Sequence, residues 1–276
     1  MNKIHVEPLN TFDEVLSIIS KMKKDETIGR YRSPYIYRGL PNIEYDLKTS
    51  LERNCREDAK HLEKCILRNF TKYASIVDKS NLINSEWRQL IIGQHHGLPT
   101  RMLDWTSSFL VALHFAMSED SLTELDKHEC VIWAIDSEET NKLLPEKYRN
   151  ILNDKEARAF TVEMLEEYRI NLEEYDTAMR DQSFIILEPP SIDERIVNQY
   201  SFFSVMPAEM TDFEKFLDER TKNTIKYVIN KDIRWQIRDT LDLMNINERI
   251  MYPGYDGICK WLKRYYFSQK KKKEKE

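Results

Sequence analysis

Three short stretches of the sequence carry the side chains that are best suited to chemistry. They are the pair Arg38-Gly39, a polar block at residues 94–108, and the acidic pair Asp193-Glu194. A guanidinium offers a planar fork of donors to phosphate oxygens, and a neighbouring glycine lets a ligand approach the backbone closely. A carboxylate stabilises positive charge that develops on a reacting group. These three stretches are therefore the first candidates for a binding or catalytic site.

A simpler interpretation exists for the arginine. Arg38 can pair with an internal carboxylate, and Asp104 is the obvious partner, because a buried arginine usually has a charged neighbour. The polar block also allows two interpretations, since a buried hydrogen-bond network occurs either beneath an active site or as part of a fold-specifying core. Its polar members are Gln94, His96, Thr100, Arg101 and Asp104.

No metal site is predicted. His95 and His96 are adjacent, which directs their side chains apart on a strand or helix. The four cysteines are scattered without a CxxC pair, so neither a zinc ribbon nor a disulfide framework is indicated.

Strands and helices must bring these stretches together. Strands are predicted at 35–38, 130–135, 184–187, 202–206 and 224–229, and helices at 11–22, 62–77, 85–91, 110–116 and 233–244. A capping box at Thr11 and Glu14 marks the first helix. The pattern predicts an α+β fold with a central mixed sheet and flanking helices. We expect one main domain over 1–269, with a helical insertion near 140–180.

Charge and hydropathy limit the partners. The formal net charge is −5, and residues 270–276 hold five lysines and two glutamates, so the remaining chain has 37 basic and 45 acidic residues. We therefore expect a disordered, lysine-rich tail at 270–276 and no nucleic-acid partner. The apolar runs are too short to cross a bilayer, and residues 1–8 do not resemble a signal peptide. We expect no membrane partner and a cytoplasmic location.

The sequence resembles the FRG domain family, which is named after an aromatic-Arg-Gly motif. The resemblance extends over residues 36–263 and rests on four blocks. These are Tyr37-Arg38-Gly39, the stretch from Gln94 to Ala116, Arg195-Ile196-x-x-Gln199, and Tyr252-Pro253-x-x-Asp256-Gly257. Naming this family does not by itself name a reaction.

The order of the blocks is also similar to that of ADP-ribosyltransferases of the Arg-Ser-Glu type, which use NAD as a substrate. This more distant resemblance implies Arg38 on a first strand, Thr106 and Ser107 on a strand that leads into a helix, and Glu194 on a late strand. The sequence departs from the pattern in three ways. Trp105 stands in place of the first serine, Ile192 stands in place of the first glutamate of Glu-x-Glu, and Arg101 and Asp104 have no counterpart.

The implied site has two groups of residues. Glu194, Arg38, Thr106 and Ser107 would be catalytic, with Glu194 bonded to a ribose hydroxyl and the hydroxyls of Thr106 and Ser107 orienting the sugar. Ser107 or Ser108 can instead simply cap the helix that follows. The cofactor-binding residues would be Tyr37, Arg38, Gly39, Gln94, His96, Arg101, Asp104 and Gln199.

Two functions from different classes follow. The first is an NAD-utilising enzyme, either an ADP-ribosyltransferase with a macromolecular acceptor or an NAD glycohydrolase, acting as a bacterial toxin or a phage-defence effector. The alternative is a non-catalytic module that binds a nucleotide-like small molecule or a protein segment. A nuclease would need a carboxylate cluster for metal ions, for which Asp104, Asp193 and Glu194 are the candidates.

Overall fold

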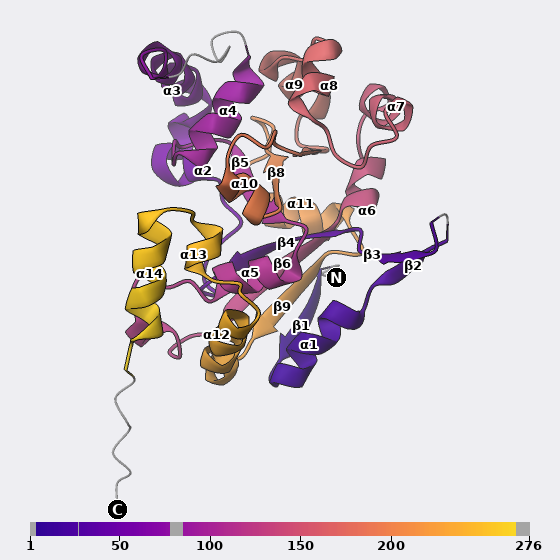
Figure 1. The fold of residues 1–276 in the computed structure, drawn as a ribbon. Coiled ribbons are helices and arrows are strands. Elements are labelled where there is room, and N and C mark those ends of the chain that lie inside the picture. Colours follow the sequence, from indigo (N-terminus) through magenta and orange to yellow (C-terminus); the bar gives the residue numbers. More distant parts are fainter. Residues whose placement is uncertain (1–3, 27, 78–84, 269–276) are drawn as a thin grey trace, which may run out of the picture.

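A seven-stranded mixed sheet runs through the middle of the protein (Figure 1). The structure, a computed structural model, describes residues 4–26, 28–77 and 85–268. The sheet has the strand order β1-β9-β6-β4-β5-β8-β7, in which β1 and β9 are parallel and the other neighbours antiparallel. Its strands are β1 (His5–Leu9), β4 (Tyr35–Leu40), β5 (Met102–Thr106), β6 (Cys130–Asp136), β7 (Ile185–Leu187), β8 (Ser201–Val205) and β9 (Ile225–Ile229). The predicted α+β class with one main domain is confirmed.

Helices surround the sheet, and the predicted ones are present. Those on the N-terminal side are α1 (Phe12–Ser20), α2 (Ser50–Cys55), α3 (Ala59–Ala74), α4 (Glu86–His95) and α5 (Phe109–Ala116). Between β6 and β7 follow α6 (Ser137–Lys142), α7 (Glu146–Asp154), α8 (Val162–Glu167) and α9 (Leu172–Met179). The later helices are α10 (Glu194–Asn198), α11 (Phe213–Arg220), α12 (Arg234–Leu243), α13 (Glu248–Met251) and α14 (Tyr255–Tyr265).

Local sequence explains where several helices begin. Thr11 and Glu14 form the predicted capping box at α1, with the Thr11 side chain accepting a hydrogen bond from the Glu14 backbone N–H. Ser85 caps α4 and Ser108 caps α5 in the same way, each accepting from the backbone N–H three residues later. The hydroxyl at 108 therefore has the capping role that the sequence left open.

Side chains alternate between the two faces of the sheet, so each face has its own core. On β6, Ile132 and Ala134 pack with α1, α5 and α12, whereas Val131 and Trp133 pack with α11. The first of these faces continues over β5, β8 and β7, where α4, α7, α8 and α9 cover it. Helices α5 and α4 thus cover adjoining halves of one face, and β4 and β5 meet between them.

The register between β4 and β5 consists of a single residue pair, Tyr37 with Thr106. By contrast, β4 pairs with β6 over six residues, from Tyr35 to Leu40. The seam between β4 and β5 is therefore the weakest backbone ladder near the centre of the sheet.

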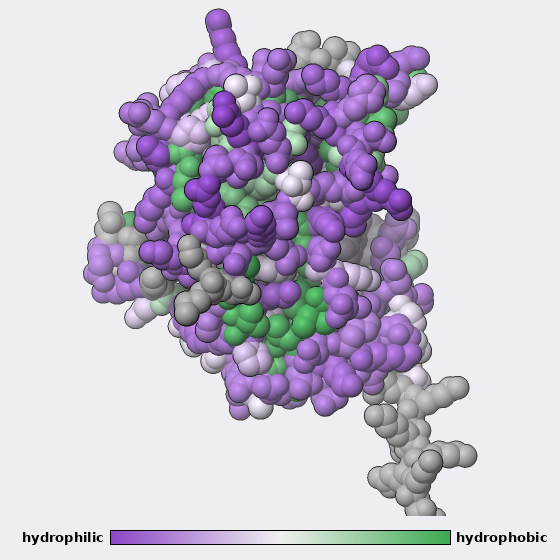
Figure 2. All heavy atoms as spheres, turned by 180° about the vertical axis from the view of Figure 1, so that it is seen from behind, coloured by the Kyte–Doolittle hydropathy of each residue, from purple (hydrophilic) through white to green (hydrophobic). Residues whose placement is uncertain are grey.

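Elements outside the sheet complete the outline. The short strands β2 (Lys23–Asp25) and β3 (Arg30–Arg32) form a separate antiparallel hairpin. Seen from behind, most of the surface is hydrophilic, and the largest hydrophobic patch lies low in the centre, with smaller ones in the upper half (Figure 2). Within the described ranges, no helix combines the length and the apolar character needed to cross a membrane. The predicted lysine tail, 270–276, lies outside the described residues.

A network of buried charges joins α5 to the C-terminal helices. The Arg238 Nη1 donates to the His114 Nδ1 at 2.8 Å, and both side chains are fully buried. Around them, Arg264 forms paired hydrogen bonds with Asp242 and with Glu248, at 2.6–2.7 Å. Burial first, and then the positive charge of Arg238, lower the pKa of His114 to about 3. The imidazole is therefore neutral in the folded protein.

The state of His114 predicts a loss of stability in mild acid. An unfolded histidine titrates near pH 6.5, so the unfolded chain binds more protons than the folded protein between that pH and about 3. Stability from this group is complete above pH 6.5 and falls as the pH is lowered. Urea unfolding at pH 5 is expected to show about 2 kcal/mol less stability than at pH 7.

A variant tests the assignment to His114. The amide oxygen of His114→Asn can still accept from Arg238 but does not titrate, so its stability is expected to depend less on pH over the same range. Burial also lowers the pKa of His95, so part of the pH dependence should persist. An unchanged pH dependence in the variant would contradict the role of His114.

Candidate functional site

Arg38 lies at the seam between β4 and β5. Its Nη1 donates to the backbone oxygen of Asp104 at 2.7 Å and lies 3.5 Å from the Asp104 carboxylate. The side chain is only 15% exposed, and its Nε has no hydrogen-bond partner among the described residues. Arg38 thus pairs with Asp104, as the simpler interpretation proposed, and still has an unused donor.

The electrostatic surroundings of Arg38 are mixed. Burial lowers its pKa, the charge of Asp104 raises it, and the positive charge of Arg53 lowers it again. Two guanidinium groups therefore influence one another near a single carboxylate. An anion placed between them would relieve that repulsion.

Asp104 begins a chain of hydrogen bonds through the polar block. Gln94 Nε2 donates to Asp104 Oδ2 at 2.9 Å, and the Thr100 hydroxyl donates to Gln94 Oε1. Thr100 in turn accepts from the backbone N–H of Met102 at 3.2 Å. The Asp104 side chain is nevertheless 59% exposed, although β5 is an inner strand of the sheet. The network is therefore accessible to solvent at its acidic end.

The two later sequence blocks adjoin the polar block. Arg195 donates to the backbone oxygen of His95 at 3.2 Å, and its guanidinium lies 5.1 Å from the centre of the Tyr252 ring. The Nε2 of His95 contacts an oxygen of the Asp193 carboxylate. The charge of Asp104 contributes to raising the pKa of Tyr252, an effect that is mainly due to burial. All four blocks of the sequence thus meet around Asp104.

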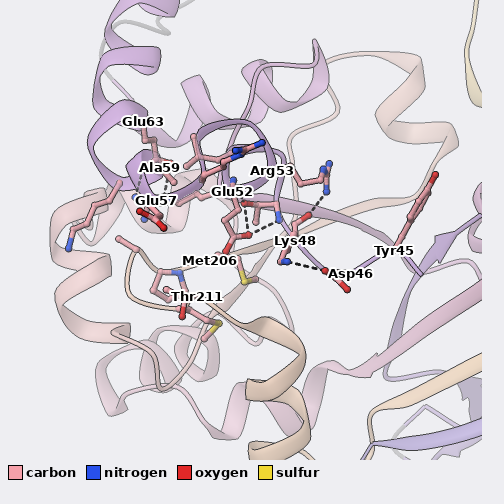
Figure 3. Close-up of a pocket in the computed structure, with 18 of the residues that line it drawn as sticks. Tyr45, Asp46, Lys48, Glu52, Arg53, Glu57, Ala59, Glu63, Met206 and Thr211 are labelled. Atoms are coloured by element: carbon pink, nitrogen blue, oxygen red, sulfur yellow. Dashed lines mark hydrogen bonds and ion pairs between the residues drawn. The ribbon is translucent and has the colours of Figure 1, made fainter. Parts of the chain in front are cut away.

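A cleft of about 1100 Å³ lies on the other side of Arg38. In Figure 3, Glu52 and Arg53 of α2 lie on one side of this cleft, and Met206 and Thr211 lie opposite. Both Arg38 and Arg101 line it. The cations along its walls are Arg38, Lys48, Arg53, Arg56, Lys60 and Arg101. Five carboxylates also line the cleft, those of Glu44, Asp46, Glu52, Glu57 and Glu63. Its size and its cations suit a nucleotide-sized anion.

Arg101 differs from Arg38 because two carboxylates bond to its guanidinium and leave none of its nitrogens without a partner. It forms two hydrogen bonds with Glu63 of α3 and one, at 2.6 Å, with Asp176 of α9. Arg101 and Glu63 are both buried. Of the two interpretations of the polar block, the fold-specifying core is the one that this arrangement favours for Arg101.

Thr106 and Ser107 lie where β5 leads into α5, as the resemblance implied. Thr106 is buried, pairs with Tyr37 and Ser201, and accepts a hydrogen bond from the backbone N–H of Ser108. Ser107 is exposed, and its backbone N–H donates to the Tyr200 oxygen at 3.2 Å. Only the hydroxyl of Ser107 is therefore open to a ligand from solvent.

Glu194 is the first residue of the short helix α10, so the expectation that it lies on a strand is wrong. Asp193 caps this helix by accepting from the Ile196 backbone N–H at 3.0 Å. The strand begins later, at Ser201. The Glu194 side chain is exposed and has no hydrogen bond or ion pair within the part of the chain that the structure describes.

Four other predicted site residues have varied surroundings. Tyr37 is buried against Phe109 on the face opposite Arg38, and His96 is exposed at the end of α4. Gln199 donates to the Met251 backbone oxygen at 2.9 Å, which ties α10 to α13. A Cβ on Gly39 would lie 2.0 Å from the Ala112 backbone oxygen. Gly39 therefore allows α5 to pack against β4, and this packing alone accounts for the glycine.

Sequence reasoning did not assign Arg53, Arg195 or Tyr252 to the site. Arg195 and Tyr252 belong to the motifs that carried the resemblance, which was a usable signal. Arg53 had no signal of its own, because a charged residue on a short helix is usually solvent-exposed without a function. Its place beside the cleft depends on how α2 packs.

In comparisons with known proteins, a family model matches about one third of the chain. The family model of the FRG domain matches residues 33–124, so this part of the chain carries an FRG domain, as its motifs predicted. The matched segment includes Arg38 and the whole polar block, whereas Glu194 and Tyr252 lie beyond it. No curated protein and no solved structure matches the chain.

Proposed function

We propose that this protein binds the diphosphate of NAD beside Arg38 and uses the bound NAD as a substrate. The observation that carries the proposal is the Arg38 guanidinium, which is largely buried, borders the cleft of about 1100 Å³, and has an unpartnered Nε among the described residues. An unused donor in a buried guanidinium is costly unless water or a ligand supplies the acceptor. Arg195, Arg234 and Arg238 have the same unpartnered Nε, but none of them lines the cleft. A diphosphate supplies several charged oxygens to such a fork.

The arrangement of the strands supports NAD as the ligand. Strands β4, β5 and β8 are neighbours in the sheet. The first two carry Arg38 and Thr106, and the third is preceded by the helix of Glu194. These are the three elements that the resemblance to ADP-ribosyltransferases assigns to the NAD site. Their order and adjacency in the sheet fit that arrangement, although Glu194 lies on a helix and the side chains of Arg38 and Thr106 leave the sheet on opposite faces.

The reaction breaks the bond between the ribose C1′ and the nicotinamide nitrogen. Nicotinamide leaves with the bonding electrons, and the sugar passes through a transition state that resembles an oxocarbenium ion. Glu194 would stabilise this positive charge and accept a hydrogen bond from the ribose hydroxyl. Water or a nucleophile of an acceptor then bonds to C1′ and loses a proton. Consumption of NAD in this way is how the protein would act as a toxin or a phage-defence effector.

The test is release of nicotinamide from NAD by the purified protein, followed by chromatography. Glu194→Gln is expected to reduce the rate by at least about 100-fold, because it removes the charge while keeping the shape of the side chain. Binding of ADP-ribose should change little. Glu146→Gln, on the exposed surface of α7, is the matched control and should retain full activity. Equal rates in the wild type and Glu194→Gln would refute the role of Glu194.

A binding module without catalysis is the second candidate. It is favoured by the lining of the cleft, which includes Arg38 but neither Glu194 nor Ser107. In this case Arg38 would hold a nucleotide that no carboxylate attacks or polarises. ADP-ribose and NAD would then raise the unfolding temperature equally, and mass spectrometry would recover the NAD unchanged after prolonged incubation.

A further inference from the structure

A row of four cations runs along one side of α3. Lys60, Lys64, Arg68 and Lys72 are spaced four residues apart, which places them on one helix face. All four are exposed, and no carboxylate of the described residues forms an ion pair with any of them. Like charges at this spacing destabilise a helix, so helix stability does not account for the row.

The row borders two cavities that share a wall. The second cavity has a volume of about 970 Å³, and Lys60, Lys64, Arg68 and Lys72 all line it. Lys60 also lines the first cleft, as does the buried Arg101–Glu63 pair between the two spaces. The cations therefore follow a hollow along α3 that begins at the proposed nucleotide cleft.

Several acidic groups on the far side of the second cavity already have partners. Asp176 bonds to Arg101 and to the Ala208 backbone N–H, and Glu86 accepts from the Leu172 backbone N–H at 3.1 Å. Glu173 and Glu209 are exposed there. An anionic ligand would therefore lie on the α3 side of the hollow.

Exposed tyrosines accompany the cations. Tyr45, which is 52% exposed, lines the first cleft, and Tyr73, which is 62% exposed, follows Lys72. The Lys72 ammonium lies 5.3 Å from the centre of the Tyr73 ring. Tyr73 lines neither cavity, so Tyr45, in the first cleft, is the ring that faces the hollow. Cations along a groove together with exposed aromatic rings bind single-stranded nucleic acid through phosphates and stacked bases.

We infer that a single strand of nucleic acid binds along α3, with its phosphates on Lys60, Lys64, Arg68 and Lys72. A hollow with an evenly spaced row suits an extended polyanion better than a flat membrane surface. The net charge of the chain predicts no such partner, but charge is unevenly distributed. Residues 48–74 hold seven lysines and arginines and four acidic residues. The inference goes beyond NAD use, because strand binding needs no turnover.

The test is fluorescence polarisation with a labelled oligo-uridine of about 20 nucleotides, titrated with the full chain at several salt concentrations. The wild type is expected to bind at about 50 mM salt and to weaken as salt rises. Lys64→Gln/Arg68→Gln should bind at least about 10-fold more weakly. The slope of log K against log salt concentration should be less steep by about 1.4, because two phosphate contacts are lost.

The control is Lys142→Gln/Lys215→Gln, which removes two exposed lysines on α6 and α11. Circular dichroism establishes that each variant is folded. Nicotinamide release, measured on the same variants, separates this inference from the NAD proposal. No binding by the wild type at low salt would overturn the inference. An equal loss of oligonucleotide binding in the control variant would also overturn it. So would the finding that Lys64 and Arg68 are needed for binding to anionic vesicles while the protein does not bind the oligonucleotide.

Discussion

Replacing Arg38 by alanine is expected to weaken binding of ADP-ribose by about 10- to 100-fold. Hydrogen bonds to a charged group contribute about 1.5–3 kcal/mol each, and Arg38 is the largely buried guanidinium with an unused donor beside the cleft. Isothermal titration of the wild type and the variant measures the change. Arg38→Lys keeps the charge but loses the planar fork, so it should recover only part of the affinity.

A second arginine controls for a general effect on folding. Arg149 also donates to a backbone oxygen, that of Leu144, but it lies on α7 and does not line the cleft. Arg149→Ala should therefore bind ADP-ribose as the wild type does. If Arg38→Ala binds ADP-ribose with wild-type affinity, the ligand does not contact Arg38, and the proposed function loses the observation that carries it.

Replacing Arg101 by alanine is expected to lower the free energy of unfolding by about 3–5 kcal/mol. The change leaves the Glu63 carboxylate buried without the guanidinium that engages both of its oxygens. An uncompensated buried charge has a cost of this size. Arg101→Ala also removes the hydrogen bond to Asp176, which is one of the ties to α9 beside that of Tyr175 to Val205. Equilibrium denaturation by urea measures the loss.

The double variant Arg101→Met/Glu63→Leu separates charge from packing. Apolar side chains of similar volume often replace a buried ion pair with little loss, so this variant should recover most of the stability. A loss of less than about 1 kcal/mol in Arg101→Ala would show that Glu63 finds water or another partner. It would then contradict the structural role of the pair.

Much of the fold could be predicted from the sequence because it depends on local patterns. The helix caps at Thr11, Ser85 and Ser108 could be identified from sequence, as could the strand of Arg38 between aromatic residues and a turn. Strand β1 was missed, because His5–Leu9 is short, contains Pro8, and pairs with a strand about 220 residues away. A proline is compatible with an edge strand, but only tertiary pairing reveals that edge.

Only part of the candidate site could be predicted from the sequence. The Arg38–Asp104 contact followed from residue types, whereas the partners of Arg101 come from α3 and α9, at distances along the chain that no motif encodes. Gly39 was correctly singled out, but α5 packing accounts for it. At Glu194, Asp193 ahead of an apolar pair was a readable sign of a helix cap, and the resemblance to a strand-borne glutamate obscured it.

We expect the single residue pair between β4 and β5 to separate the ladders of the sheet into two groups, although the core under α11 spans both. One contains β1, β9, β6 and β4 with α5, and the other contains β5, β8 and β7 with α4. Local opening costs less where a ladder is short, so amide hydrogen exchange should be faster along this boundary than along the β4–β6 ladder. Arg38 is the side chain that bridges it. A ligand that engages Arg38 is therefore also expected to change how often the sheet opens locally between β4 and β5.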